Sequence, residues 1–399
     1  MMVAGFVNPF RPGAGHQPPY LAGRTEEQQE FVRLLEQEAI LDNLILTGLR
    51  GVGKTVLMDS LKPVAVQKGW AWVGTELSET VSVTEESLAT RIITDLSVIT
   101  SNFTYTETLL AAPGFTSVPE VKVHKLDYAF LMTRYRDTPG LVADKLKAIL
   151  HIAWSCVSTS NMRGIIFAYD EAQTLADHAE KEQYPFSLLL DVFQSIQKTG
   201  IRFMLLLTGL PTLFPKLVQA RTFAERMFRV LTLDRLSTEE TKQAIEVPVK
   251  NSPIKPSASS VMTICNMSGG YPYFVQFICR EVFDVWVNDS TAKVPIDSIS
   301  NKLDTDFFAG RWARATDRQR DLLSIIAELP NADSEFSVAE IVAESKNTLQ
   351  PFSSSHVNQM LGSLSDSGLV YKNRYGKYAF AVPMLEDFIK RQGIKGDGG

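Results

Sequence analysis

The sequence predicts an α/β fold in which helices cover both faces of a parallel sheet. Two observations lead to this prediction. Short, continuously apolar segments alternate with helical patterns up to about residue 236, which is typical of strands buried on both faces. A glycine-rich turn, Gly48–Thr55, also stands between the first of these strands and the helix after it.

The predicted elements follow a regular order. Residues 1–19, rich in proline and glycine, are expected to form an extended arm. The expected strands are 43–47, 70–74, 164–169, 202–208 and 229–233, and the expected helices are 25–39, 54–66, 85–97, 140–158, 186–198 and 213–224. The segment 103–139 has turn signals but no clear period, so we interpret it as an insertion or a long loop.

The chain then changes character twice. Residues 237–308 carry helical patterns throughout, starting with the capping sequence Ser237–Glu240. From about residue 311, three helices are followed by two strands and a last helix. We therefore expect an α/β domain over 20–236, a helical domain over 237–308 and a third domain over 311–392.

Composition and charge limit the function. The 399 residues are 45% hydrophobic and 21% charged, with a net charge of −5, so there is no global attraction to nucleic acid or to an anionic membrane. The three cysteines show no disulfide pattern or metal spacing, which favours a reducing, cytoplasmic location. No segment reaches the roughly 18 apolar residues of a membrane span.

The glycine-rich turn matches the phosphate-binding pattern G-x-x-x-x-G-K-[ST] in full. Its residues are Gly48, Leu49, Arg50, Gly51, Val52, Gly53, Lys54 and Thr55. In this pattern the backbone N–H groups hold phosphates, the lysine contacts the β- and γ-phosphates, and the hydroxyl binds Mg²⁺. The sequence therefore predicts that this loop binds ATP with Mg²⁺.

The apolar strand 164–169 ends in the acid pair Asp170–Glu171. Open α/β sheets bind ligands at the carboxyl ends of their strands. We expect Asp170 to hold the magnesium through water and Glu171 to act as a general base on the attacking water. Thr208 ends the next strand; it either bonds the γ-phosphate or the lytic water, or simply caps the turn that follows.

These motifs together resemble the AAA+ ATPases, a RecA-like class of P-loop NTPases with a helical lid. Leu21-Ala22-Gly23-Arg24 is similar to the box that opens the origin-recognition/Cdc6-like ATPases, which implies that the backbone of Gly23 and Arg24 lies near the adenine. Ser268-Gly269-Gly270-Tyr271-Pro272 resembles a lid element of STAND and archaeal-type ATPases, which implies that Pro272 packs near the nucleotide. The resemblance extends over residues 8–390.

The resemblance also implies a homo-oligomer, because AAA+ proteins complete the site with an arginine of the neighbouring subunit. Arg226 and Arg229 stand at the corresponding place, and we favour Arg226. The alternative is an ordinary surface arginine paired with Glu225 or Glu239.

The third domain looks like a winged helix-turn-helix. Lys372, Arg374 and Lys377 in the expected hairpin are candidates for contacts with double-stranded DNA. However, from Arg311 onward there are 11 Lys and Arg against 11 Asp and Glu, and the helix 354–365 has no cation. DNA contact and protein docking therefore both stay open.

Three functional hypotheses follow. In the first, the chain hydrolyses ATP to ADP and phosphate, and its nucleotide state controls assembly on DNA or partner proteins, in replication, transposition or defence. In the second, it is a STAND-like signalling switch with slow turnover and a protein-docking winged helix. In a third hypothesis, ATP merely stabilises a regulator.

Overall fold

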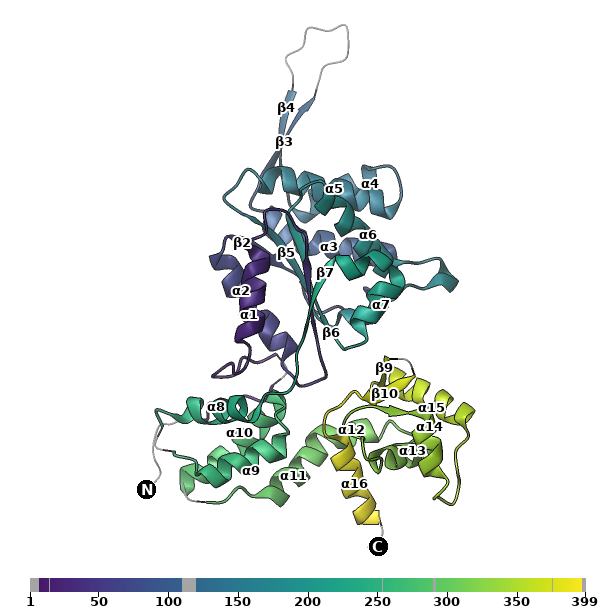
Figure 1. Cartoon of the computed structure of the whole chain (residues 1–399). Coiled ribbons are helices and arrows are strands. Elements are labelled where there is room, and N and C mark those ends of the chain that lie inside the picture. The colour runs from purple at the N-terminus through teal and green to yellow at the C-terminus, as the bar shows by residue number, and fades with distance from the viewer. Residues whose placement is uncertain are drawn as a thin grey trace. The chain divides into compact units, whose positions relative to one another are not determined.

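The computed structural model describes residues 7–13, 15–109, 120–252, 254–289, 292–374 and 376–396 (Figure 1). The chain forms two compact units. The first, here the sheet unit, contains Thr25–Thr47 and Leu57–Thr232. The second, here the lid unit, contains the chain up to Arg24, the segment Gly48–Val56, and the chain from Leu233 onward.

A five-stranded parallel sheet forms the centre of the sheet unit, in the order β2-β5-β6-β1-β7. The strands are β1 (Asn43–Thr47), β2 (Trp70–Val73), β5 (Gly164–Tyr169), β6 (Phe203–Gly209) and β7 (Phe228–Thr232). Every residue of β1, β5 and β6 is buried. Because the strands are parallel, β1, β5 and β6 all end at the same edge of the sheet.

Helices cover both faces of this sheet. They are α1 (Thr25–Leu35), α2 (Lys54–Gln67), α3 (Glu85–Thr100), α5 (Val142–Val157), α6 (Pro185–Lys198) and α7 (Leu213–Ala220). Ile165, Phe167 and Tyr169 of β5 share a core with α3, α5 and α6. Ile166 and Ala168 point to the other face and are buried as well. The two-sided coverage explains the uniformly apolar strands.

Of the two interpretations of 103–139, an insertion or a long loop, the long loop is wrong. The segment contains a hairpin of β3 (Thr104–Leu109) and β4 (Glu120–Lys125), followed by α4 (Tyr128–Asp137). Asp127 caps α4 by accepting from the Phe130 N–H, and the Phe130 ring stacks on His124 of β4 at 5.0 Å. The sequence did carry a signal for β4, in which Val121 and Val123 alternate with polar residues, but both valines are more than half exposed and so belong to no buried core.

The lid unit begins with a helical lid. Its helices are α8 (Thr238–Val249), α9 (Ala258–Ser268), α10 (Pro272–Asn288) and α11 (Ile296–Leu303), continued by a π-helical turn (Asp304–Phe308) and α12 (Ala309–Trp312). Ser237 caps α8 in the predicted capping box with Glu240. None of the helices in the described ranges is both long enough and apolar enough to cross a membrane.

The rest of the lid unit, residues 313–396, is here called the C-terminal module. It consists of α13 (Asp317–Ala327), β8 (Phe336–Ser337), α14 (Val338–Ser345), α15 (Ser354–Asp366), β9 (Val370–Arg374), β10 (Lys377–Phe380) and α16 (Leu385–Gly396). The three strands form an antiparallel sheet in the order β8-β10-β9.

The lid and the C-terminal module share one hydrophobic core. Phe308, at the end of the π-helical turn, is fully buried. Its ring stacks on Phe388 of α16 at 5.1 Å and lies 6.0 Å from Phe274 of α10. Aromatic contacts of this kind hold the two parts together.

We expect Phe308→Ala to lower the free energy of unfolding of the lid unit by about 3–5 kcal/mol, because it removes a fully buried ring and leaves a cavity. Urea denaturation followed by circular dichroism measures this change. Leu349→Ala is the control, since Leu349 is fully exposed. Equal stabilities of the two variants would show that the shared core does not depend on this ring.

Candidate nucleotide site

The P-loop, Gly48–Thr55, belongs to the lid unit and follows directly after β1. Gly48 has φ +155°, and a Cβ there would lie 2.4 Å from the carbonyl oxygen of Leu233. Only glycine fits this close approach. Lys54 begins α2 and is 8% exposed; its Nζ donates to the carbonyl oxygens of Gly48 and Leu49, both at 2.9 Å. The lysine is thus folded along the loop.

Arg24 stabilises the P-loop through hydrogen bonds to backbone carbonyl oxygens. It is 6% exposed, and its guanidinium donates to the carbonyl oxygen of Val52 at 2.9 Å and to that of Asp234 at 2.8 Å. Gly23 beside it has φ +63°, and a Cβ there would meet Glu240 of the lid at 2.6 Å. Both residues of the predicted box therefore pack where the P-loop, the arm and the start of the lid meet.

The lid contacts the P-loop directly. Pro272 is the first residue of α10, and the N–H of Tyr273 donates to the carbonyl oxygen of Gly51 at 3.2 Å. Gly270 accepts from the N–H of Leu236 at 2.8 Å, which ties the turn before α10 to the segment that enters the lid. Pro272 therefore lies next in sequence to a residue that bonds the P-loop.

The acid pair belongs to the sheet unit. Asp170 is 5% exposed and follows β5; its Oδ1 accepts from the Thr208 hydroxyl at the end of β6 and from the Glu171 N–H at 2.8 Å. Thr208 is fully buried. The structure thus brings together two residues that the sequence placed at the ends of separate strands, and Thr208 orients the Asp170 carboxylate.

Glu171 stands on a left-handed backbone, with φ 52°. Its carboxylate accepts a hydrogen bond from the side-chain amide of Gln173, whose oxygen accepts from the N–H of Leu210 at 3.1 Å. Gln173 therefore links Glu171 to the turn after β6. Sequence reasoning missed Gln173, because nothing in the motif distinguishes a glutamine two residues beyond the acid pair.

Asp59 is a second residue that the motifs did not identify. It lies on α2 one helical turn after Thr55, so the two face the same way. Burial, and then the neighbouring Asp170 carboxylate, raise the pKa of Asp59. The spacing of four residues was a signal that could have found it.

The two candidate arginines differ in their surroundings. Arg229 forms an ion pair with Glu30 of α1, with 2.9 Å between Nε and Oε1. Arg226 ends a short 3₁₀ turn, is exposed, and forms no ion pair with any residue that the structure describes. A neighbouring molecule could contact Arg226 without breaking an ion pair, whereas contact with Arg229 would compete with Glu30.

The three candidate DNA contacts of the C-terminal module also differ. Lys372 on β9 is exposed. Lys377 on β10 pairs with Glu340 at the start of α14, with 3.0 Å between the charged atoms. Arg374 ends β9, but its side chain lies outside the described residues.

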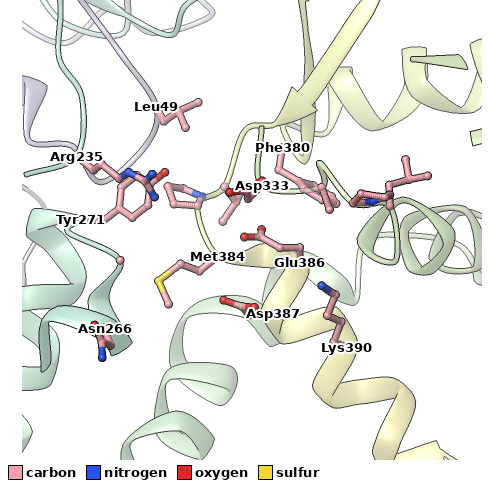
Figure 2. Close-up of a pocket in the computed structure, with 16 residues that line it drawn as sticks. Leu49, Arg235, Asn266, Tyr271, Asp333, Phe380, Met384, Glu386, Asp387 and Lys390 are labelled. Atoms are coloured by element: carbon pink, nitrogen blue, oxygen red, sulfur yellow. The ribbon is translucent and has the colours of Figure 1, made fainter. Parts of the chain in front are cut away.

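A pocket of about 380 Å³ lies within the lid unit beside Leu49 of the P-loop (Figure 2). The lid lines it with Arg235 and Tyr271, and the C-terminal module with several residues of both charges, Asp333, Glu386, Asp387 and Lys390 among them. Burial, with smaller contributions from the charges of Asp387 and Asp333, raises the pKa of Glu386 to about 7. This carboxyl therefore gains a proton near neutral pH.

The chain is similar to several proteins of known structure. A family model described as a domain of unknown function (DUF8462) matches residues 305–389, and no curated protein matches the sequence. The Walker-type ATPase PABY2304 of Pyrococcus abyssi is similar with a TM-score of 0.58 and 13% identity, over 93% of this chain and 96% of that chain.

The Aeropyrum pernix ORC2 protein is similar as well. Its ADP form has a TM-score of 0.54 and 13% identity, over 96% of this chain and 97% of that chain. The structure of its ADPNP-ADP complexes has a TM-score of 0.53 and 14% identity, over 96% of this chain and 98% of that chain. At such low identity the likeness shows the fold alone, and it agrees with the predicted α/β fold built on a parallel sheet.

We expect Glu386→Gln to raise the melting temperature at pH 8 by about 2–5 °C and to have a much smaller effect at pH 5. The pKa of Glu386 is higher in the folded chain than its ordinary value of 4.5, so the folded state binds the proton more tightly. Stability is therefore lost as pH rises from about 4.5 to about 7, and the loss persists above pH 7.

Thermal denaturation at the two pH values measures this effect. Asp366→Asn, at an exposed carboxyl of α15, is the control. A Glu386→Gln shift of equal size at both pH values would contradict the raised pKa.

Proposed function

We propose that this chain binds ATP with Mg²⁺ and hydrolyses it to ADP and phosphate. The observation that carries the proposal is that a polar segment follows or ends each of three neighbouring strands of the sheet. The P-loop follows β1, the acid pair follows β5, and Thr208 ends β6, the strand between them. The similar structures, a Walker-type ATPase and the ADPNP-ADP complexes of the ORC2 protein, also support nucleotide binding.

The chain's own residues fit the substrate. The turn at Gly48 and Gly51, followed by the first turn of α2, provides backbone N–H groups for phosphate oxygens. Lys54 would exchange its bonds to loop carbonyls for bonds to the β- and γ-phosphates. Arg24 and Tyr273 would keep the loop in shape during this exchange, because they hold its carbonyl oxygens at Val52 and Gly51.

The residues also fit a magnesium ion. Thr55 and Asp170 supply a hydroxyl and a carboxylate, the hard oxygen ligands that Mg²⁺ prefers. When bound, the ion would neutralise charge on the β- and γ-phosphates. Thr208 would keep Asp170 oriented, and Glu171 would accept a proton from the attacking water, with Gln173 orienting its carboxylate.

We further propose that Arg226 completes the site of a neighbouring molecule in a homo-oligomer. An arginine at the γ-phosphate stabilises the charge of the transition state. Arg226 is exposed and has no ion pair in the described part of the chain, whereas Arg229 is engaged by Glu30. This difference supports the choice that the sequence favoured.

We propose that the C-terminal module is a winged helix that docks DNA or a partner protein under control of the nucleotide state. The order of three helices and a three-stranded antiparallel sheet supports the winged-helix assignment. The pairing of Lys377 with Glu340 weakens the hairpin as a phosphate contact and favours protein docking at that edge. The STAND-like switch with slow turnover is the second candidate, supported by the bond between the lid's Tyr273 and the P-loop.

We expect Lys54→Ala to abolish ATP binding, because the loop loses the ammonium group that would bind the β- and γ-phosphates. Glu171→Gln should retain binding but lower kcat at least about 100-fold, since the general base is lost. Fluorescent ATP titration and steady-state phosphate release, with and without duplex DNA, measure both. Tight ATP binding by the wild type without turnover would reject the enzyme and leave the switch.

We expect Arg226→Ala to lower kcat at least about 100-fold while ATP affinity stays within about twofold. Mixing it with Glu171→Gln should restore activity in part, because each inactive chain supplies what the other lacks. Arg33→Ala, an exposed arginine on α1, is the matched control. An Arg226→Ala chain with wild-type turnover would rule out the trans role.

A further inference from the structure

Three arginines of the lid unit stand in the P-loop and at the end of α12. They are Arg50 of the P-loop, Arg311 of α12 and Arg314 just beyond that helix. None of them forms an ion pair with a carboxylate among the residues that the structure describes. Arg311 is half-buried and Arg314 is exposed.

Packing brings the P-loop arginine to the C-terminal module. A Cβ on Gly368, in the turn before β9, would come within 3.3 Å of a guanidinium nitrogen of Arg50. The next P-loop residue, Gly51, is bonded to Tyr273. The Tyr273 ring lies 5.0 Å from that of Phe307, and the Arg311 guanidinium sits 4.2 Å over the Phe307 ring. The rings of Tyr273 and Phe307 therefore connect the P-loop to the Arg311 guanidinium.

Arg311 lies within range of the charges of the other two arginines. Burial, and then the positive charges of Arg50 and Arg314, lower the pKa of Arg311. Like charges gathered without carboxylates cost free energy unless an anion joins them. Guanidinium groups bind phosphates through paired, planar hydrogen bonds, which makes arginine the preferred residue for such an anion.

We propose that Arg50, Arg311 and Arg314 form a binding site for the phosphodiester backbone of nucleic acid. In the proposed function, the phosphates of a nucleotide are bound by the P-loop N–H groups and by Lys54, whose Nζ here donates to the Gly48 and Leu49 carbonyl oxygens. Arg50 instead lies against Gly368, two residues before β9, the strand that carries the exposed Lys372.

The site has a consequence for the proposed ATPase, on which this part of the inference rests. Arg50 belongs to the P-loop itself, so a phosphodiester held by Arg50 acts on the same loop that holds ATP. The net charge of −5 provides no general attraction to nucleic acid, so binding would require a local site such as this one. Contact with nucleic acid would thereby couple to nucleotide turnover.

The test is duplex binding by the full chain, measured by fluorescence anisotropy of a labelled 30-base-pair duplex over a salt series. Arg314→Gln removes an exposed side chain and should not disturb the fold. We expect it to reduce the slope of log K against log salt by about 1, and Arg311→Gln/Arg314→Gln to reduce it by about 2. The affinity of the double variant at about 0.1 M salt should fall about tenfold.

The matched control is Arg33→Gln/Lys68→Gln, which removes two exposed cations from the sheet unit and should leave the slope unchanged. Arg311→Lys keeps the charge without the planar fork and should recover part of the affinity. Fluorescent ATP titration of the same variants should give the wild-type affinity.

Three outcomes would overturn the inference. The wild type binds no duplex even at low salt; the arginine variants keep the wild-type slope; or they lose ATP affinity and not duplex affinity, which would assign the cluster to the nucleotide. Duplex binding that depends on the arginines in a chain without ATP turnover would instead keep the site and reject the proposed enzyme.

Discussion

The buried guanidinium of Arg24 is the interaction on which the P-loop geometry depends. A loop rich in glycine has many conformations available to it, and ordering it costs conformational entropy. Arg24 limits these conformations by bonding the carbonyl oxygens of Val52 and Asp234 at once. A charge buried in this way is stable only while its acceptors stay in place, so the loop, the arm and the entry to the lid are fixed together.

The second constraint lies at the end of the sheet. Asp170 is almost fully buried, and a buried carboxylate requires donors. Thr208 and the Glu171 N–H provide them. Thr208 belongs to β6, the strand between β1 and β5. Its hydrogen bond to Asp170 therefore fixes the position of the acid pair relative to β6. Gln173 extends the network from Glu171 to the turn after β6.

The lid unit adds a different kind of coupling. Its core runs without interruption from α10 through Phe307 and Phe308 to α16. The N–H of Tyr273 bonds the P-loop at one end of this core, and Phe388 belongs to the C-terminal module at the other. A close-packed core transmits displacement, because its side chains have no free space into which to relax. The P-loop and the C-terminal module are therefore linked through packing as well as through Arg50.

The sequence by itself determined the α/β class and the order along the chain of the five parallel strands and the helices between them, and it predicted a P-loop and an acid pair, because each depends on local periodicity or on a contiguous motif. It failed for the hairpin at 104–125, whose strands pair only with each other and lie outside the parallel sheet. It also could not find Gln173 beside Glu171, Arg24 under Val52, or the approach of Arg50 to Gly368. Only the tertiary structure decided these contacts, because they join residues whose separation along the chain carries no pattern and whose partners are chosen by packing.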